Sequence, residues 1–151
     1  MSPLGVPDLV AQINELRASA GVGPLTPMAV STTIAGHTIL GQGGYAQQWA
    51  EHIATQNRMV HSLVSANEAW WNTNTPAPAG KTWDCLEVLA GSARSPSSSV
   101  AVGFWAQSAG HRAIVTAAGA THVGVGAMRA DDGTQYFVAQ PCYLTDAGPG
   151  G

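Results

Sequence analysis

The sequence predicts an α+β fold in which helices cover an antiparallel sheet. Two observations support this prediction. Apolar side chains recur at helical spacing in three segments between residues 9 and 108. The chain then changes to alternation by two residues, on both sides of a turn signal at residues 131–133. With 151 residues, of which 45% are hydrophobic, the chain has the size and composition of one globular domain.

The first two helices are predicted from their ends and their apolar stripes. Pro7 and Asp8 favour the start of the first helix, and Gly21 is expected to end it. Its stripe consists of Leu9, Val10, Ile13 and Leu16. The second stripe consists of Tyr45, Trp49, Ile53, Gln56 and Val60. The second helix is therefore expected to end at His61, where the helix dipole favours an imidazolium.

A loop, a short strand and a third helix are expected next. Residues 72–80 have the composition of a loop, and the apolar run 86–90 predicts a short strand that contains Glu87. Serines between residues 92 and 99 offer N-caps for the third helix, and Gly110 is expected to end it.

A β-hairpin is predicted at the C-terminal end of the domain. Residues 121–128 and 135–140 alternate between apolar and other side chains, and the Asp-Asp-Gly turn joins them. Gly124 and Gly126 fall on one face of the first strand. Their missing side chains leave room for another element to pack closely against that strand.

Composition excludes two classes of partner. Charged side chains make up 10% of the chain, the net charge is −3 at pH 7, and Lys81 is the only lysine. We therefore expect no groove for nucleic acid and no basic membrane-binding patch. Residues 18–50 contain no charged side chain, but glycines and prolines interrupt their apolar runs, which predicts loops and a short helix rather than a membrane span.

The chain contains two cysteines, Cys85 and Cys142. A disulfide between them would close a long loop and contribute about 4 kcal/mol, whereas two buried free thiols are the alternative. Low charge and five tryptophans suit an exported domain and favour the disulfide. Residues 1–8 lack the basic start and apolar run of a signal peptide, so a leader is expected to have been removed.

Three residues are candidates for site chemistry: His61, Glu87 and His111. Each histidine follows an amphipathic segment, and Glu87 is the only acid between Asp84 and the turn at residue 131. Two imidazoles and a carboxylate can hold a divalent ion such as Zn²⁺ or perform acid–base chemistry. Separate structural roles at two helix ends are the alternative. No nucleotide-binding glycine motif is present, so no organic cofactor is expected. Glu68 and Asp84 are expected to be solvated.

Two blocks of sequence resemble those of a known family. Residues 45–62 form a helix followed by His-Ser, and residues 104–115 read Phe-Trp-Ala-Gln-Ser-Ala-Gly-His-Arg-Ala-Ile-Val. Thr-His-Val-Gly-Val-Gly follows at residues 121–126. These blocks resemble the CAP superfamily, which comprises cysteine-rich secretory proteins, antigen 5 proteins, plant pathogenesis-related class-one proteins and bacterial relatives. Residues 13–17 with Pro24 and Leu25 are similar to the family's opening helix and turn.

The resemblance implies a three-layer α-β-α sandwich with a central antiparallel sheet and a solvent-open cleft. His61 and His111 match the two cleft histidines of the family, and Glu87 matches its cleft glutamate. These three residues are therefore the expected ligands of a divalent ion. The family's second acid falls on Ser108. His122 stands where a glutamate is usual, which places a third imidazole near the cleft or on the surface.

The resulting hypothesis is a monomeric, exported CAP domain over residues 9–144, with an N-terminal extension (1–8) and a flexible tail (145–151). It acts as a binding module for a lipid, sterol or protein ligand through a cleft that can hold a metal ion. The alternative is a metal-dependent, peptidase-like hydrolase that uses His61, Glu87 and His111. A structural domain with an inert cleft is a third possibility. Binding is preferred because no residue pair forms an activated nucleophile and the second carboxylate is missing.

Overall fold

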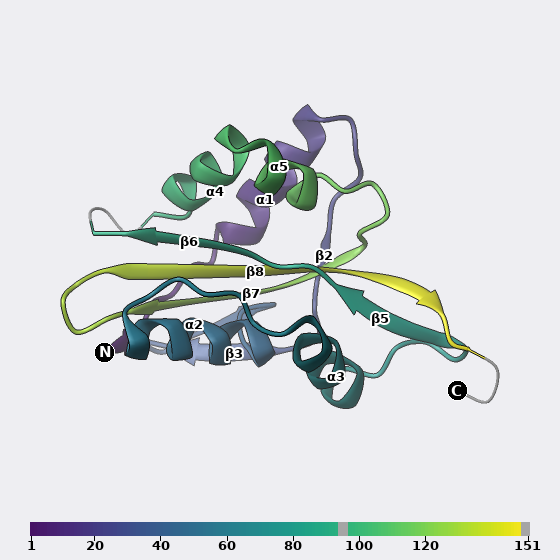
Figure 1. The fold of residues 1–151 in the computed structure, drawn as a ribbon, viewed down its shortest axis with the longest axis horizontal. Helices are drawn as coiled ribbons and strands as arrows, with labels where there is room; N and C mark the ends of the chain where they lie inside the picture. The colour runs from purple at the N-terminus through teal and green to yellow at the C-terminus, as the bar shows by residue number, and fades with distance from the viewer. Residues whose placement is uncertain (94–96, 149–151) are drawn as a thin grey trace.

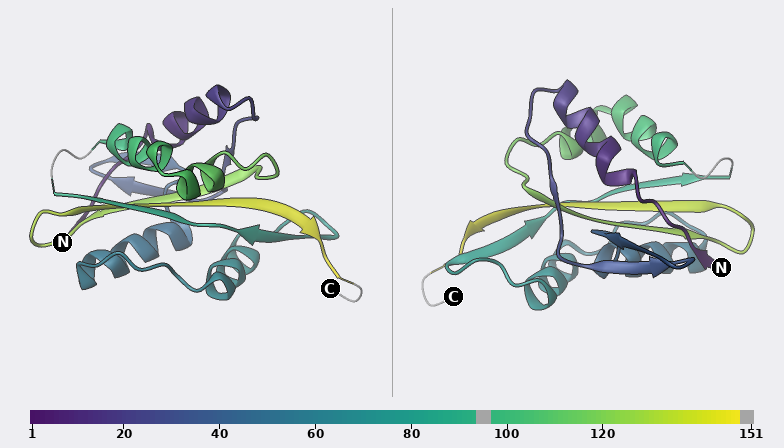
Figure 2. Two further views of the ribbon diagram at one scale, coloured as in Figure 1. Left: turned by 45° about the horizontal axis from the view of Figure 1, so that its top comes forward. Right: turned by 180° about the vertical axis from the view of Figure 1, so that it is seen from behind.

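The computed structural model describes residues 1–93 and 97–148. A central sheet lies between two layers of helices (Figure 1). One face is covered by α1 (Leu9–Ser19), α4 (Ser98–Gln107) and α5 (Ala109–Val115). The other face is covered by α2 (Gly44–Gln56) and α3 (Val64–Asn74), and two further views show the same three layers (Figure 2). The predicted α+β class and the α-β-α sandwich are confirmed.

The long strand β8 (Gln135–Asp146) organises the sheet. It pairs antiparallel with β7 (His122–Arg129) along one edge, which confirms the predicted hairpin. Along its other edge, its first half pairs with β6 (Val88–Ser92) and its second half with β5 (Lys81–Cys85). Two short strands, β1 (Ser2–Pro3) and β2 (Thr26–Pro27), add to β7. Glu87 therefore lies at the break where the chain passes from one half of β8 to the other, and the strand expected over 86–90 begins at Val88.

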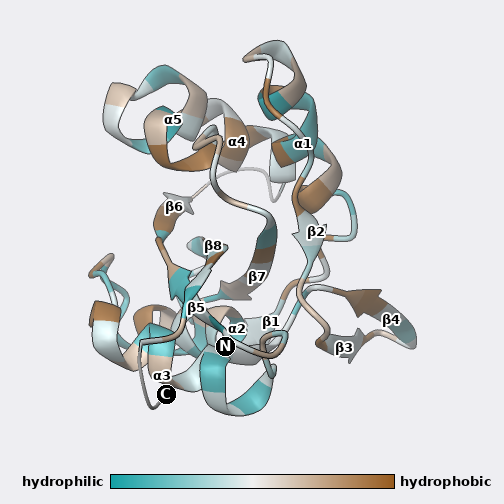
Figure 3. Cartoon of the chain, turned by 90° about the vertical axis from the view of Figure 1, so that its right-hand side faces the viewer, coloured by the Kyte–Doolittle hydropathy of each residue, from teal (hydrophilic) through white to brown (hydrophobic). Residues whose placement is uncertain are grey.

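Alternating side chains of β8 supply two cores, one on each face of the sheet. Phe137 and Ala139 pack under the layer of α1, α4 and α5, together with Trp105. Tyr136 and Val138 pack against α2 and α3, together with Trp71. The hydropathy colouring in Figure 3 shows apolar segments of α1 and α4 turned toward the sheet. Both tryptophans are fully buried, so each anchors one layer.

The glycines of β7 allow the close approach that the sequence predicts. A Cβ atom on Gly124 would collide with the ring of Trp71, and one on Gly126 would lie 2.5 Å from Cα of Gln47. Both clashes are with the α2–α3 layer. Gln47 also joins this contact directly, since its Nε2 donates to the carbonyl of Ala127 at 2.9 Å.

The side chain of Arg17 connects α1 to the end of α5 and to the segment that follows it. The residue is 1% exposed, and no ion pair joins it to a carboxylate in the described part of the chain. Its guanidinium donates instead to the carbonyls of Gly23, Val115, Ala117 and Ala120. It thereby satisfies carbonyl groups that the end of α5 leaves without helical partners.

The end of α2 differs from the prediction. The helix stops at Gln56, because Asn57 adopts a left-handed conformation with φ 47°. His61 therefore lies in the loop between α2 and α3 and not at a helix C-terminus. The helix α3 was not predicted, and it occupies part of the segment expected to be a loop. Only Asn67 and Trp71 of this helix are buried, so it shows no apolar stripe.

The predicted third helix is divided into two. Ser97 caps α4 by accepting a hydrogen bond from the backbone nitrogen of Val100 at 3.3 Å, as the serine-rich segment predicts. Ser108 then adopts extended geometry with ψ 121° and separates α4 from α5. Gly110 does not end the helix, and His111 lies within α5 rather than after it. Residues 94–96 of the serine-rich segment lie outside the described residues.

A second hairpin was not predicted within residues 18–50. Strands β3 (Ser31–Ile34) and β4 (His37–Leu40) pair antiparallel and project from the molecule (Figure 3). Ala35 and Gly36 join them with φ values of 51° and 82°, the left-handed conformations of a type I′ turn.

Both ends of the chain contact the sheet. Ser2 and Pro3 form β1, and Val6 is buried, within the segment expected to be an N-terminal extension. Thr145 and Asp146 belong to β8, within the segment expected to be a flexible tail. Residues 149–151 of that tail lie outside the described residues.

Candidate functional site

The carboxylate of Glu87 is the centre of the candidate site. Its Oε1 accepts hydrogen bonds from Nδ1 of His61 at 3.0 Å and from the backbone nitrogen of Ser62 at 2.9 Å. Its Oε2 accepts from Oγ of Ser62 at 2.6 Å and from Nε2 of Gln140 at 2.9 Å. The Glu87 side chain is 7% exposed. A buried carboxylate requires such donors, and these four bonds fill its acceptor positions.

This arrangement orients the imidazole of His61. Ser62 and Gln140 supply donors to the carboxylate, so Glu87 acts as an acceptor and Nδ1 of His61 carries the hydrogen. Nε2 is then the ring nitrogen with a free lone pair. The His61 side chain is 58% exposed. Glu87 therefore holds an imidazole whose accepting nitrogen is available to solvent or to a ligand.

The helical layer on one side fixes the orientation of Gln140. This residue lies in β8 and is fully buried. Its Oε1 accepts a hydrogen bond from the indole nitrogen of Trp71 at 2.9 Å, which directs Nε2 toward Glu87. A chain of hydrogen bonds thus runs from the core tryptophan through Gln140 and Glu87 to the exposed His61.

Two contacts hold the loop that carries His61. The indole nitrogen of Trp49 donates to the carbonyl of Val60 at 2.8 Å. At the start of the loop, the hydroxyl of Tyr136 donates to Oδ1 of Asn57 at 2.7 Å. Burial and the charge of Glu87 raise the pKa of Tyr45. The loop is therefore fixed from α2 and from the sheet.

The disulfide between Cys85 and Cys142 is formed, as predicted. The two residues face each other in the register of β5 and β8. Next to the bridge, the backbone nitrogen of Leu86 donates to the carbonyl of Pro141 at 2.8 Å. Together, these bonds fix the backbone between β5 and β6, which carries Glu87.

His61 and His111 line two neighbouring hollows rather than a single one. The hollow beside His61 has a volume of about 190 Å³ and also contains Ser62, Asn67, Glu87 and Ile114. The hollow beside His111 has a volume of about 320 Å³ and is lined by Met59, Phe104 and Ser108 among others. His111 and Ile114 are three residues apart on α5, so they share a face of this helix. The two hollows therefore lie next to each other along α5, the hollow of His61 at Ile114 and the hollow of His111 one turn earlier.

The described side chains do not form a three-ligand metal site. Within residues 1–93 and 97–148, no three His, Cys, Asp or Glu side chains are placed to hold an ion together. The acceptor positions of Glu87 are already filled, which favours a role in orienting His61 over a role as a ligand. The prediction that His61, His111 and Glu87 bind a divalent ion stays a prediction.

Exposed apolar side chains lie at the two hollows and next to His61 in the chain. Seven large apolar side chains are exposed in the described part of the chain. Five of them border the hollows or lie within three residues of His61: Met59, Val60, Leu63, Val64 and Phe104. We call these five the apolar rim. Clustered apolar side chains of this kind mark interaction surfaces in soluble proteins, whereas single exposed ones do not.

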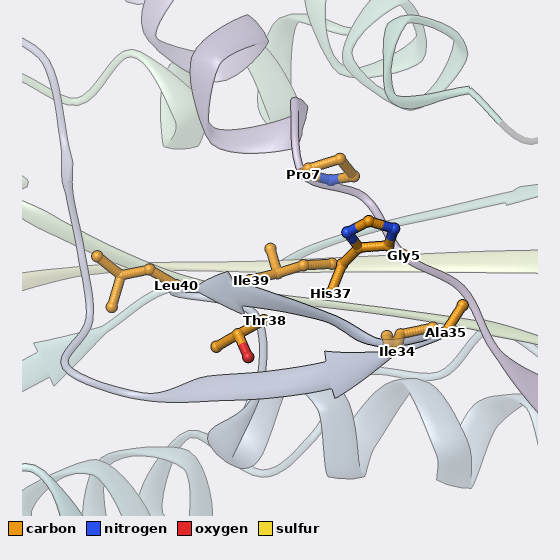
Figure 4. Close-up of a pocket in the computed structure, with 8 residues that line it drawn as sticks. All are labelled: Gly5, Pro7, Ile34, Ala35, His37, Thr38, Ile39 and Leu40. Atoms are coloured by element: carbon orange, nitrogen blue, oxygen red, sulfur yellow. The ribbon is translucent and has the colours of Figure 1, made fainter.

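The other histidines lie elsewhere. His122 lines a hollow with Trp83 and does not reach the Glu87 site. His37 lines a larger, mainly apolar cavity of about 700 Å³ between β4 and the segment before α1 (Figure 4). In Figure 4 its ring stands between Gly5 and Ile39, and this cavity shares no lining residue with the hollow beside His61.

Glu68 and Asp84 are half-buried rather than solvated. Burial and the neighbouring charge of Asp84 raise the pKa of Glu68. This carboxyl thus lies where its ionised form is disfavoured.

Sequence reasoning did not identify Ser62 and Gln140 as parts of the site. Ser62 follows His61 directly, but its hydroxyl serves the carboxylate and not the imidazole. Gln140 is the polar residue that ends the alternating strand 135–140. A buried amide at that position indicates that a hydrogen-bond partner is present, but the sequence does not identify that partner.

None of the helices among the described residues is long and apolar enough to cross a membrane. No curated protein matches the chain by sequence. The fold is similar to that of an outer surface protein from Borrelia burgdorferi, with a TM-score of 0.63 and 14% identity over 96% of this chain and 100% of that one. The model of the CAP family, described as the cysteine-rich secretory protein family, matches residues 40–141. This match includes Glu87, both histidines of the two hollows and the first cysteine of the disulfide, so the chain belongs to the CAP family.

Proposed function

We propose that the protein is an exported binding module that takes up an amphipathic ligand, a lipid or a sterol, on the apolar rim around His61. The observation that carries this proposal is the position of the rim. Five of the seven large apolar side chains exposed in the described part of the chain line the two hollows or lie within three residues of His61, whose imidazole contacts a buried carboxylate. The rim would cover the apolar part of the ligand, and Nε2 of His61 would accept a hydrogen bond from its polar group.

The disulfide supports export. Disulfides form and persist in oxidising compartments and are rare in the cytosol. Cys85 and Cys142 form such a bond, and the matching family is described as secretory.

Binding of two fluorescent probes tests the proposal. Dehydroergosterol represents sterols and cis-parinaric acid represents fatty acyl chains. We expect at least one of them to bind, and the double substitution Leu63→Ser/Val64→Ser to weaken that binding about tenfold or more, since each buried aliphatic side chain contributes about 1.5–3 kcal/mol.

Leu40→Ser is the matched control. Leu40 is 63% exposed on the β3–β4 hairpin, close to the 73% of Leu63, and lines a cavity that shares no residue with the two hollows. Unchanged binding in the Leu40 variant is expected. The proposal is wrong if neither probe binds, or if the Leu63/Val64 variant binds as tightly as the unsubstituted protein.

A second candidate function is a metal-dependent hydrolase. The observation that favours it is the Nδ1 contact of His61 with a carboxylate, since metal-binding histidines commonly donate their other ring nitrogen in this way. Calorimetry with Zn²⁺, combined with a broad peptide-substrate screen, separates the two functions. Turnover that chelators and His61→Ala both abolish would support the hydrolase over the binding module.

A further inference from the structure

A second cavity lies where the end of α3 meets the start of β7. It has a volume of about 320 Å³ and shares no lining residue with the hollows beside His61 and His111. Its walls come from the segments 26–29 and 75–78 and from three strands of the sheet. The lining residues are Thr26, Pro27, Met28, Ala29, Thr75, Pro76, Pro78, Trp83, His122 and Leu144. We call it the Thr75–His122 cavity.

The walls of this cavity are apolar and rigid. Three prolines and one indole provide flat surfaces, and the indole is fixed because Trp83 Nε1 donates to the carbonyl of Thr75 at 2.6 Å. None of the lining residues is Asp, Glu, Lys or Arg. An uncharged ligand fits such a lining, because nothing in it would compensate the desolvation of a charge.

One buried hydroxyl in the wall of this cavity lacks a partner among the described residues. Thr75 is 7% exposed, and its Oγ1 forms no hydrogen bond with any described residue. A buried hydroxyl left without a partner costs about 1–3 kcal/mol. Native proteins rarely tolerate such a group without a water molecule or a ligand to satisfy it.

His122 supplies a second polar group at the cavity. Its Nδ1 lies 2.8 Å from Oγ1 of Thr121, so Nε2 is the nitrogen left for a ligand. The ring packs edge-on against Trp83, with the centroids 4.9 Å apart. Burial lowers the pKa of His122 and thereby favours the neutral imidazole.

We propose that the Thr75–His122 cavity binds a small, uncharged aromatic molecule that carries a hydroxyl group. The ring would pack against Trp83 and the prolines. The ligand hydroxyl would donate to Nε2 of His122, and Oγ1 of Thr75, which is closed to solvent in this structure, would turn into the cavity and donate to the ligand oxygen. Size permits this, since an apolar cavity of roughly 150 Å³ is sufficient for benzene. The proposal does not depend on the function proposed for the apolar rim, because the two sites share no residue.

Phenol is the probe, and toluene, which has a methyl group in place of the hydroxyl, is the comparison ligand. Heteronuclear NMR titration follows the indole N–H of Trp83 and the imidazole of His122. We expect saturable binding of phenol, and weaker binding of toluene by about tenfold, which corresponds to one hydrogen bond.

Thr75→Val gives the decisive comparison, because valine keeps the shape of threonine and removes the hydroxyl. We expect this variant to unfold at a higher temperature without ligand and to bind phenol about tenfold more weakly, with toluene binding unchanged. Thr55→Val, at an exposed position on α2, serves as the control and should change neither quantity.

Two results would overturn the proposal. One is the absence of saturable changes in the NMR signals of Trp83 and His122 on addition of phenol, which would mean that water occupies the cavity. The other is an unchanged phenol affinity in Thr75→Val. If that variant does not fold, His122→Phe provides the same comparison, since it removes Nε2 and should weaken phenol binding relative to toluene.

Discussion

His61 and His122 show how two environments assign different chemistry to one residue type. His61 is exposed, and a buried carboxylate with four hydrogen bonds holds its Nδ1. His122 is half-buried, contacts a neighbouring hydroxyl and packs against Trp83. The first environment suits an imidazole that meets a ligand from solvent. The second suits a neutral imidazole inside an apolar cavity, because burial lowers its pKa.

The disulfide connects these two regions. Cys85 lines the hollow beside His61, and Cys142 lies opposite His122 in the register of β7 and β8. We expect its removal in Cys85→Ser/Cys142→Ser to have the largest effect, a loss of about 4 kcal/mol in the free energy of unfolding. Denaturant unfolding measures this loss. Equal stability of the oxidised protein and the variant would show that the bridge does not support either region.

The substitution Glu87→Ala disrupts the environment of His61 and leaves that of His122 intact. It leaves Ser62 and Gln140 with unpaired donors, so we expect a loss of about 3 kcal/mol and a fall in Tm of roughly 6–12 °C. Glu51→Ala, at an exposed position on α2, is the control and should leave Tm within about 1 °C. NMR signals of the His122 ring should stay unchanged in Glu87→Ala. A shift of those signals would contradict the independence of the two regions.

The pH dependence of stability tests the second region. The folded pKa of His122 is lowered, so the unfolded chain binds more protons between the folded and unfolded pKa values. This residue therefore contributes stability above pH 6.5 that is lost as the pH falls below that value. For a half-buried group with solvent screening, we expect about 0.5 kcal/mol.

His122→Phe should remove that part of the pH dependence, measured as the difference in unfolding free energy between pH 8 and pH 5. An identical difference in the variant and the unsubstituted protein would mean that His122 is not held neutral by burial.

The smallest effect is expected for the substitution of Glu68, whose carboxyl lies in a different environment from that of Glu87. Burial and Asp84 raise the pKa of Glu68, so the folded state binds more protons and loses stability as the pH rises through that pKa. We expect Glu68→Gln to raise Tm at pH 7 by roughly 1 °C, and to give no gain at a pH below the ordinary glutamate range. A fall in Tm at pH 7 would show that the ionised carboxylate of Glu68 is stabilised by its surroundings.

Several parts of the fold could be predicted because they depend on neighbours in the chain. The stripe that starts at Leu9, the serine cap of α4 and the turn before Gln135 are local patterns, and the structure contains each of them. The α3 helix could not be predicted in this way, since only Asn67 and Trp71 face inward. Its helical state is decided by packing against β5 and the glycine of β7 at residue 124.

The candidate site follows the same division. Residue types alone identify the chemistry that is available, since an oriented imidazole needs a carboxylate and the chain contains His61 and Glu87. They do not show that Glu87 meets partners 25 and 53 residues away, at the break where β5 and β6 pair with different halves of β8. The hydrogen-bond partners of a buried group are set by the pairing of distant strands, and no periodicity along the chain records that pairing.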